Sequence, residues 1–591
     1  MCGIIGYIGQ NDVAKKILHN LKKLEYRGYD SSGICLKKNN TLFVKKSVGE
    51  ISNLQSKINI NFNSHVGIAH TRWATHGKVN VTNTHPHISQ DKMWAVVHNG
   101  IIENYLEITK QLKEKGIHLY SETDSEVIAN LMAISQKQNN ILKLHEVTTL
   151  LHGSYALCLI NAKEETLYIA RRHSPLYVAH KDDACMVSSD PACFSEDFHD
   201  YYVLPDECIA TVNSDGVKFY DQNMKILNLT PCEIGTFEKS SELGKYSYYA
   251  EKEISEIPHV LNDIILNYQT VDHFKHINKS FLKHIKSIKL IGCGTAYHAC
   301  MIGAKYLEKF TKIEANAYIA SEFRYQNPMV DKNTLCIFLS QSGETADTLL
   351  SLELAKSKGA KTLAIVNVPY SSIARNADIV LPLCAGIEIA VMSTKAYNAM
   401  LMVLYLLSVH IANINNDFSL TFPSEVKYIN FFKNIEKIDE ISDLVLKSDK
   451  TFFIGRGEDY VTALEAGLKL KEITYINCVS LPSGELKHGT ISLIDKKSLV
   501  FVISTDEKLL SKNLTSASEI KARGGKIVLV TNLDVQDNKD VDYIYKIARP
   551  KEEISSILSV IPFQVLAYKT CLKKGYSPDK PRNLAKSVTV E

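Results

Sequence analysis

The stretch Lys289-Leu290-Ile291-Gly292-Cys293-Gly294 recurs later in the same chain as Phe452-Phe453-Ile454-Gly455-Arg456-Gly457. Each copy is an apolar run that ends in a glycine-rich turn, a pattern typical of a buried strand that leads into a helix. Two further landmarks recur in the same order, Cys336–Ser340 with Val500–Ser504 and Lys358–Lys361 with Arg523–Lys526. The offset between the copies stays constant to within about two residues, which indicates an internal repeat. The sequence therefore predicts two copies of one α/β domain.

Strand–loop–helix alternation extends over this whole half of the chain. Such alternation is typical of a doubly wound parallel sheet with helices on both faces. We expect one such domain at residues 279–420, a second at 442–581 and a catalytic tail at 582–591. Ligands of these sheets bind beyond the carboxyl ends of the strands, so the loops that follow the strands are the candidate site.

The first part of the chain has a different pattern, in which short β-type runs alternate with a few helical stretches. Apolar residues have helical spacing at Val13–Leu24, Asn104–Lys115 and Ser125–Ser135. We therefore expect residues 2–220 to form sheets packed against helices. Residues 221–278 are predicted to be a polar linker followed by a connecting helix at Ala250–Tyr268.

Composition and charge exclude several classes of protein. The 591 residues are 45% apolar and 23% charged, and the net charge is only +3, so nothing favours nucleic-acid or membrane binding. No secretory signal is recognisable, and the longest apolar run, Met400–Val409, is about half of a membrane span, so it predicts a buried helix. The 13 cysteines form no CxxC pair, which favours a reducing, cytoplasmic location.

Cys2 is the strongest candidate for a nucleophile. Removal of Met1 would leave its α-amine, with an ordinary pKa of about 7.7–8.0, on the same residue as the thiol. One residue could then supply both nucleophile and base. The alternative is a small buried cysteine at the start of a β-strand, because the run Cys2–Gly9 is apolar.

Three polar side chains and one backbone N–H could serve a thiolate that attacks glutamine. The Asn99 amide and the Gly100 N–H suit an oxyanion hole. Arg72 suits the carboxylate of free glutamine, and Asp124 suits its amino group. Taken singly, Arg72 and Asp124 would more often form a surface ion pair, and Asn99-Gly100 an ordinary turn.

Five histidines lie close together in the sequence, namely His70, His76, His85, His87 and His98. A metal site through His85 and His87 is one alternative, but no carboxylate or cysteine stands at ligand spacing beside them. Structural or substrate-lining roles are favoured, and no metal is expected.

The N-terminal motifs, taken in order, resemble the N-terminal-nucleophile (class II) glutamine amidotransferases. The motifs are CGIIGYIG, LEYRGYDSSG, AHTRWATHG, HPH, VHNGIIENY and SETDSEVIA. The resemblance implies a four-layer αββα sandwich with Cys2 as nucleophile and Asn99 and Gly100 as the oxyanion hole. It also implies a glutamine pocket, with Arg27 nearby, formed by Arg72, Trp73, Thr75, His76 and Asp124. The products would be glutamate and ammonia, so another domain must use the ammonia.

A hydroxyl-rich loop follows Cys336–Ser340, the second landmark of copy one. Ser340, Gln341, Ser342 and Thr345 stand between a β-run and the start of a helix, where hydroxyls and backbone N–H groups can hold a phosphate monoester. A simple capping loop is the alternative. Copy two has Asp506 and Glu507 at the equivalent place, which would repel phosphate, so copy one is the predicted phosphate site.

Acid–base chemistry on a ketose needs a base, an acid for ring opening and a group that polarises the carbonyl. Glu472, His488 and a lysine fit these needs. The alternatives are a solvated helix face around Lys469-Leu470-Lys471-Glu472 and a disordered C-terminal tail.

The C-terminal motifs resemble the paired sugar isomerase (SIS) domains of the isomerising glutamine–fructose-6-phosphate aminotransferase family. The motifs are GCGTAYHA, SQSGET, STKAY, LKLKE, GELKHG and DKPRNLAKSVTVE. The resemblance implies that Lys586 forms a Schiff base with the sugar, Glu472 moves the proton between C1 and C2, and His488 assists ring opening. It assigns the sugar-phosphate site to Cys293, Gly294, Thr295, Glu388, Ser393-Thr394-Lys395 and Lys469, beside the SQSGET loop.

The resemblance also implies partners. The substrates would be L-glutamine and D-fructose 6-phosphate, no cofactor would be required, and the protein would be a homodimer with an ammonia channel gated by Trp73. The family usually has serine where this chain has Ala296, and proline where it has Thr490. Loss of one neutral hydrogen bond at Ala296 would cost about 0.5–1.5 kcal/mol of sugar binding, and Thr490 would loosen the loop of His488.

Two alternatives stay open at this point. An aminotransferase of the same architecture could act on a different ketose phosphate. The departure from the family pattern at Ala296 is compatible with this alternative. A sugar-phosphate sensor on an inactive amidotransferase domain is the second alternative, although a sensor need not keep Cys2, Asn99, Glu472 and Lys586. A phosphoribosyl amidotransferase is disfavoured by the SIS repeat, and an asparagine synthetase by the absence of an SGG-type loop.

Overall fold

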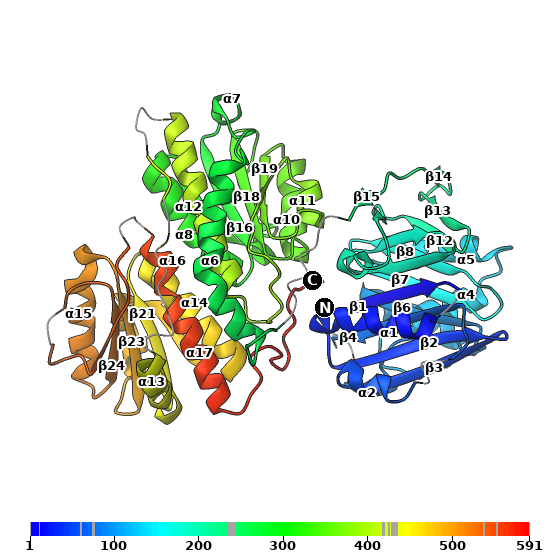
Figure 1. Ribbon diagram of the computed structural model, residues 1–591, viewed down its shortest axis with the longest axis horizontal. Coiled ribbons are helices and arrows are strands. Elements are labelled where there is room, and N and C mark those ends of the chain that lie inside the picture. Colours follow the sequence, from blue (N-terminus) through cyan, green and yellow to red (C-terminus); the bar gives the residue numbers. More distant parts are fainter. Residues whose placement is uncertain are drawn as a thin grey trace. The chain divides into compact units, whose positions relative to one another are not determined.

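The computed structural model divides the chain into two compact units, Met1–Lys239 with Ala585–Glu591, and Ser240–Leu584 (Figure 1). It describes residues 2–10, 12–58, 62–73, 77–234, 243–415, 420–423, 426, 435–535, 538–550 and 554–589. The last residues of the chain, which include Lys586, thus belong to the N-terminal unit.

Two antiparallel sheets form the centre of the N-terminal unit. Among the described residues, the first sheet has eight strands in the order β15 (Cys232–Glu233), β11 (Asp200–Val203), β9 (Tyr177–Lys181), β10 (Ala184–Ser188), β1 (Gly3–Ile8), β4 (Val66–Arg72), β2 (Ser31–Lys38) and β3 (Thr41–Val48). The second has seven, in the order β14 (Ile226–Leu227), β13 (Gly216–Tyr220), β12 (Ile209–Asn213), β8 (Leu167–Arg172), β7 (Gly153–Asn161), β6 (Trp94–Ile102) and β5 (His87–Ile88).

Alternation along the strands of this unit produces four layers. In β1, Ile4 and Ile8 lie in the apolar core shared with the second sheet, whereas Ile5 and Tyr7 pack on the helix side. Helices α1 (Val13–Lys23) and α2 (Ile51–Gln55) cover the first sheet; α3 (Tyr105–Glu114), α4 (Glu126–Ile134) and α5 (Asn140–Leu150) cover the second (Figure 1). The predicted αββα sandwich is confirmed.

The segment expected to be a linker begins as part of these sheets. Strands β14 and β15 each have two residues and pair with β13 and β11. The sheets therefore extend past residue 220, and the connecting helix, α6 (Tyr249–Thr270), begins the second unit.

Two parallel sheets form the second unit. Within the described residues, the first has the order β17 (Glu314–Ile319), β16 (Ser287–Gly292), β18 (Thr334–Ser340), β19 (Lys361–Val366) and β20 (Ile379–Pro382). The second has the order β22 (Cys478–Pro482), β21 (Lys450–Gly455), β23 (Ser498–Ser504), β24 (Lys526–Thr531) and β25 (Tyr543–Lys546). The two orders match strand for strand, as the repeat predicts.

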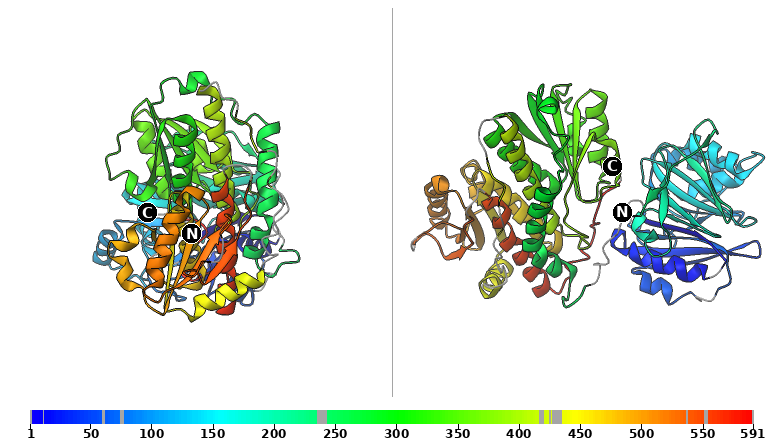
Figure 2. Two further views of the ribbon diagram at one scale, coloured as in Figure 1. Left: turned by 90° about the vertical axis from the view of Figure 1, so that its left-hand side faces the viewer. Right: turned by 45° about the horizontal axis from the view of Figure 1, so that its top comes forward.

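A shared layer of helices lies between these two sheets, as Figure 2 shows. It contains α6, α8 (Thr295–Thr311), α12 (Lys395–Asn415), α13 (Ile435–Lys447), α14 (Glu458–Thr474), α16 (Ser555–Ser559) and α17 (Ile561–Lys573). The outer faces are covered by α9 (Ala320–Phe323), α10 (Ala346–Ser357) and α11 (Ser372–Asn376) on the first sheet, and by α15 (Glu507–Lys521) on the second. The short helix α7 (Lys279–Leu282) precedes β16.

The same backbone geometry begins the first helix of each copy. Gly294 has φ 53° and ψ −123° before α8, and Gly457 has φ 62° and ψ −125° before α14. Glycine reaches this conformation without the penalty that a Cβ would bring. The two helices then pack against each other across the middle of the unit.

Two stretches of this helix layer, Lys395–Ile414 and Ser555–Lys573, are long and apolar enough to cross a membrane by length and composition alone. In each, 83% of the most apolar window is buried inside the protein, as in the core helices of globular domains. The apolar run Met400–Val409 lies within α12, which agrees with the buried helix predicted there.

Candidate functional sites

Cys2 precedes β1 and lies against the end of β4. The β1–β4 register pairs Gly3 with Thr71. The Cys2 thiol therefore lies near Arg72, the last residue of β4, and Trp73, which follows the strand. The Trp73 N–H donates to Cys2 Sγ at 3.4 Å, and Sγ lies 3.5 Å from the Trp73 carbonyl oxygen. Burial raises the pKa of the Cys2 thiol above its ordinary value, while the nearby Arg72 acts in the opposite direction. The thiol therefore needs a base to become a nucleophile.

Asn99, in β6, contacts the same residue. Its side-chain Nδ2 donates to the Cys2 carbonyl oxygen at 3.0 Å. Gly100 follows with φ +134°, and a Cβ at that position would lie 2.0 Å from the Ser154 carbonyl oxygen. The structure thus brings Asn99 to Cys2 and explains why glycine follows it.

His70 orients Asn99, a contact that the sequence analysis did not identify. His70 Nε2 lies 3.0 Å from both Asn99 Oδ1 and the His98 carbonyl oxygen. Because both partners are acceptors, Nε2 carries the proton, and Asn99 must turn its NH₂ toward Cys2. Burial lowers the pKa of His70 to about 3, so the ring is neutral.

Four buried histidines form an aromatic cluster behind this strand pair. The His70 and His85 rings stack at 4.2 Å between centroids, and His87 meets His85 edge-on at 4.6 Å. Burial lowers the pKa of His85 and His87 well below the ordinary value. The His98 N–H donates to His85 Nδ1 at 3.2 Å. In the part of the chain that the structure describes, no group of three or more potential ligands can hold a metal ion.

Arg72 and Asp124 are both buried, with exposed fractions of 3% and 4%. Asp124 accepts the Ile102 N–H at 2.8 Å and the Ser125 hydroxyl at 3.3 Å. Burial lowers the pKa of Arg72, an effect that Cys2, Asp30 and Asp124 partly offset. The two predicted glutamine-binding charges therefore lie within electrostatic reach of each other and of Cys2. Thr75 and His76 lie outside the described residues.

Arg27 fixes the strand that follows the nucleophile. It forms an ion pair with Asp190 and donates to the Ser189 carbonyl oxygen at 3.2 Å. The Ser189 hydroxyl in turn accepts the Ile4 N–H at 3.0 Å. Arg27 thus holds β1 at Ile4, two residues after Cys2, through a neighbouring loop.

The hydroxyl-rich loop of the second unit follows β18 and precedes α10. Ser340 Oγ lies 2.9 Å from Thr345 Oγ1 and accepts the Gly343 N–H at 3.0 Å. The Ser342 hydroxyl accepts the Glu344 N–H at 3.1 Å, and the Gln341 carbonyl oxygen accepts the Asn367 N–H at 3.1 Å. The loop is a closed cradle at the carboxyl end of a parallel strand.

Copy two has no equivalent hydroxyl cradle among its described residues. Asp459 accepts both the N–H and the hydroxyl of Thr505, at 2.8 and 2.6 Å. Asp506 caps α15 by accepting the Lys508 N–H at 2.9 Å. Carboxylates stand here where copy one presents hydroxyls, which agrees with a phosphate site in copy one alone.

A buried charge network lies between α8 and α14. Lys469 Nζ donates to Thr295 Oγ1 at 3.0 Å and pairs with Glu472 at 2.8 Å and Glu465 at 3.4 Å. Both Lys469 and Glu465 have no exposed surface. Burial alone would lower the pKa of Lys469, but Glu465 and Glu472 hold it above the ordinary value. Lys469 is therefore an ammonium beside the predicted proton-transferring carboxylate, Glu472. Glu465 is a network member that the sequence analysis missed.

Glu388 anchors the loop before α12. Its carboxylate accepts the Thr394 N–H at 2.9 Å, the Ala396 N–H at 3.1 Å and the Ser393 hydroxyl at 3.1 Å. It also contributes to the raised pKa of Lys469. Glu388 and Ser393, which the resemblance assigns to the sugar site, thus lie together, and Glu388 caps a helix start.

His488 and Lys586 are the other two predicted catalytic residues of the sugar reaction. His488 lies on an exposed turn after the 3₁₀ helix η3 (Glu485–Lys487) and before η4 (Thr490–Leu493), and no contact with Glu472 or Lys469 is found among the described residues. Lys586 belongs to the N-terminal unit. Cys293 and Gly294 form the turn into α8, directly before Thr295.

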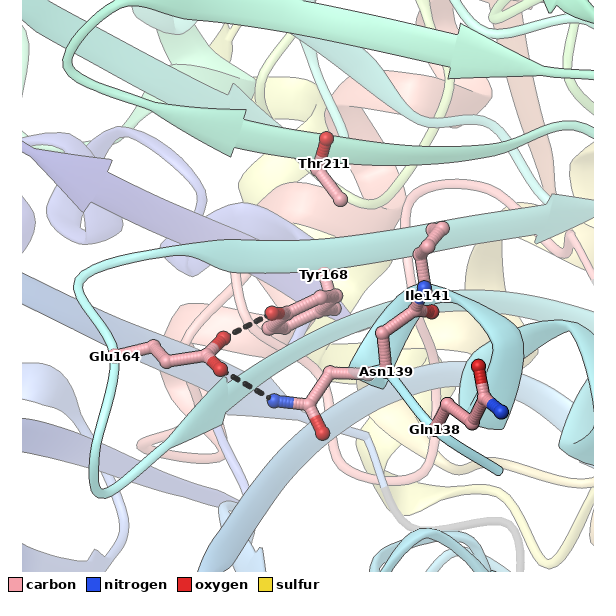
Figure 3. Close-up of a pocket in the computed structure, with 7 residues that line it drawn as sticks. Gln138, Asn139, Ile141, Glu164, Tyr168 and Thr211 are labelled. Carbon is pink, nitrogen blue, oxygen red and sulfur yellow. Dashed lines mark hydrogen bonds between the residues drawn. The ribbon is translucent and has the colours of Figure 1, made fainter.

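A polar hollow of about 370 Å³ lies on the N-terminal unit, apart from these residues (Figure 3). Its walls come from the start of α5 and the residues just before it, from the β7–β8 hairpin, and from Thr211 of β12. Glu164 within it accepts the Tyr168 hydroxyl and the Asn140 Nδ2, the latter at 2.9 Å. Its carboxylate is thus already engaged, and none of the predicted site residues lines this hollow.

Comparison with known proteins agrees with this architecture. A SIS domain is matched at residues 281–410 and again at 444–574, and a glutamine amidotransferase domain at 70–196. The glutamine–fructose-6-phosphate aminotransferase [isomerizing] of Caldanaerobacter subterraneus subsp. tengcongensis is 40% identical over 610 residues, and that of Clostridium tetani is 39% identical over 609. Each match covers 100% of both chains.

A solved structure matches the second unit. The C-terminal domain of glucosamine-fructose-6-phosphate aminotransferase from Francisella tularensis has 34% sequence identity and a TM-score of 0.52, and covers 57% of this chain and 100% of that one. Together with the full-length relatives, these similarities show that the chain belongs to the isomerising glutamine–fructose-6-phosphate aminotransferase family.

Proposed function

We propose that the protein transfers the amide nitrogen of L-glutamine to D-fructose 6-phosphate and releases L-glutamate and D-glucosamine 6-phosphate. The observation that carries this proposal is the presence of two complementary sites in one chain. Cys2 with Asn99 suits amide cleavage. The Ser340–Thr345 cradle and the Lys469–Glu472 pair, both in the second unit, suit a phosphosugar. The full-length relatives carry the name of this activity.

In the first half-reaction, Cys2 Sγ attacks the glutamine amide carbon, and the Asn99 Nδ2 and Gly100 N–H stabilise the oxyanion that forms. The α-amine of Cys2, exposed by loss of Met1, takes the thiol proton and gives it to the leaving ammonia. Water then hydrolyses the thioester to glutamate. Arg72 and Asp124 bind the carboxylate and the amino group of glutamine.

In the second half-reaction, the Ser340–Thr345 loop binds the phosphate and His488 assists ring opening. Lys586 Nζ forms an imine at C2 of the ketose, and ammonia replaces it. Glu472 then moves a proton from C1 to C2, which converts the ketose imine into the aldose amine. The overall reaction balances without an oxidant or reductant.

We further propose a cytoplasmic homodimer. Within the described residues of one chain, His488 is exposed and makes no contact with Glu472 or Lys469. A residue that assists ring opening needs a sugar beside it, and the sugar site of a second copy would provide one. Sedimentation of the purified chain tests this proposal, with a monomer as the contrary result.

The decisive experiment is one incubation with glutamine and fructose 6-phosphate in which glutamate and glucosamine 6-phosphate are measured together. Equal amounts support the proposed function. Cys2→Ala should abolish both products, whereas Lys586→Ala should keep glutamate release and lose the amino sugar. If the unchanged enzyme released glutamate but made no amino sugar, fructose 6-phosphate would not be the acceptor. Other ketose phosphates would then be tested, because Ala296 is compatible with a different sugar.

A further inference from the structure

His298, on α8, makes a short contact to the buried charge network. Its Nδ1 lies 2.6 Å from Glu465 Oε2. The His298 side chain is 13% exposed and Glu465 is fully buried. The contact joins the two copies of the repeat, because α8 belongs to the first and α14 to the second.

Every donor in this network has a defined direction. Burial would raise the pKa of Glu465, but Lys469 and His298 hold it below its ordinary value, so the carboxylate is ionised and only accepts. His298 Nδ1 therefore carries a proton. Glu465 Oε1 accepts the single hydroxyl proton of Thr295 at 3.0 Å.

This arrangement decides where the lysine protons go. Because the Thr295 hydroxyl donates its hydrogen bond to Glu465, the Thr295 oxygen acts as the acceptor for Lys469 Nζ. The ammonium of Lys469 then pairs with Glu472 at 2.8 Å. Donation by His298 satisfies the other Glu465 oxygen, which would otherwise compete with Glu472 for the same ammonium.

We propose that His298 is a positioning residue that acts through Glu465 and Lys469 to set the proton affinity of Glu472. The proposal rests on the proposed function in one respect, since Glu472 is taken as the group that moves the sugar proton. Loss of the His298 donor leaves a buried carboxylate that draws Lys469 away from Glu472, so Glu472 binds its proton more tightly.

Several other charged or titratable groups lie around His298, Glu465 and Lys469. They are Lys469 and Glu472 on α14, Tyr297 on α8 with its ring centroid 6.1 Å from that of His298, Tyr397 on α12, and Glu388 in the loop before α12. Burial raises the pKa of Tyr397 well above its ordinary value, so the phenol stays neutral. The remaining charges are carboxylates and one ammonium, and His298 adds a donor to Glu465 besides Thr295 and Lys469.

Two substitutions separate this role from simple packing. His298→Ala removes the donor, whereas His298→Asn places an amide N–H at the same distance from the backbone as Nδ1. His410→Ala is the matched control, because His410 Nε2 bonds a backbone oxygen, that of Ile277, at 2.8 Å on another helix of the same unit.

The first measurement is the pH dependence of kcat for glucosamine 6-phosphate formation by the full chain. His298→Ala should lower kcat about tenfold or more and move the acidic limb upward by about one pH unit, with KM for fructose 6-phosphate changed less than about threefold. His298→Asn should restore most of both, and His410→Ala should match the unchanged enzyme. Superimposable profiles, or equal loss in the alanine and asparagine variants, would overturn the proposal.

A second measurement does not depend on the sugar reaction. The Glu472 carboxyl can be titrated by ¹³C NMR of protein labelled at the glutamate δ-carbon, with the signal assigned from its loss in Glu472→Gln. The same upward shift in His298→Ala, reversed in His298→Asn, supports the proposal even if the unchanged enzyme makes no amino sugar. An unshifted titration would refute it while leaving the proposed function intact.

Discussion

His70 Nε2 lies 3.0 Å from Asn99 Oδ1, while Asn99 Nδ2 lies 3.0 Å from the Cys2 carbonyl oxygen. His70→Leu should therefore release the Asn99 amide from its orientation. Because removal of one oxyanion donor costs about 10²–10³ in kcat, we expect a loss of about 10–100-fold in glutaminase kcat with little change in KM. Steady-state glutamate release measures both constants.

A double substitution tests whether His70 acts through Asn99. His70→Leu combined with Asn99→Ala should be no slower than Asn99→Ala alone, because the donor to be positioned is already gone. Multiplied losses would show that His70 has an independent role. His70→Gln, which can donate from a similar place, should recover most of the rate.

Acid should destabilise the N-terminal unit steeply. His70, His85 and His87 are neutral in the fold because burial lowers each pKa, to about 3 for His70. In the unfolded chain each takes a proton near pH 6.5. Above that pH the histidines are neutral in both states and the free energy of unfolding is at its full value. As pH falls below that value, only the unfolded chain binds these protons, so the free energy of unfolding decreases. Three such groups give a slope of about 4 kcal/mol per pH unit between about pH 6 and 4. Calorimetric unfolding as a function of pH measures this slope.

An exposed histidine provides the control for this slope. His118 is exposed in the N-terminal unit, and His118→Gln should leave the pH dependence as it is. One histidine that is protonated only in the unfolded chain gives a slope of about 1.4 kcal/mol per pH unit. A smaller slope would mean that the fold does not keep even one of the three histidines neutral, contrary to the prediction.

The Thr295 hydroxyl is needed as both donor and acceptor. Thr295→Val should cost about 1–3 kcal/mol of stability, because Glu465 and Lys469 each lose a buried partner. Amino-sugar formation should fall at least about tenfold while glutaminase turnover stays the same, since stabilisation of Lys469 beside Glu472 is lost. Thr295→Ser should restore both values.

Thr311 offers a comparison on the same helix. Its hydroxyl donates to the Leu307 carbonyl oxygen at 2.7 Å, away from the charge network. If Thr311→Val reduced amino-sugar formation as much as Thr295→Val, general damage to α8 would explain both, and the specific role of Thr295 would be wrong.

The position of Gly343 in the Ser340–Thr345 loop accommodates only glycine. A Cβ at this position would lie 1.9 Å from Ser371 Oγ, and φ is +66°. Gly343→Ala should distort the loop and raise KM for fructose 6-phosphate about tenfold or more, with unchanged glutaminase activity. Gly359 has φ +81°, and a Cβ added there would meet no neighbouring heavy atom within 4 Å. Gly359→Ala therefore shares the backbone penalty of about 1–2 kcal/mol without the clash. Similar KM values for the two variants would contradict this account.

The sequence was informative where periodicity or a repeated motif carried the signal. The helix expected at Val13–Leu24 is observed at Val13–Lys23, and that expected at Ala250–Tyr268 is observed at Tyr249–Thr270. Strands β14 and β15 were missed, because two-residue strands have too few positions to show alternation.

Contacts between distant residues were the harder part of the site to predict. Glu465 belongs to a helical stretch rich in charge, which in isolation reads as a solvated face. Its burial depends on α8, which comes from the other copy of the repeat, and no local pattern records that pairing. His298 escaped notice for the same reason. Cys2 and Asn99 were identified because each has a local signal, a cysteine at the second position and an amide before a glycine. The resemblance then supplied the long-range information.

The equivalent helices α8 and α14 meet across the centre of the second unit. If two identical, unlinked domains met along this helix, a twofold axis would force each side to present the same groups. Every contact between a carboxylate and an ammonium would then occur twice, once on each side of the axis. Covalent linkage of the copies lifts that constraint. One helix can supply a hydroxyl and an imidazole while the other supplies carboxylates and an ammonium, so a single asymmetric centre replaces two symmetric half-sites.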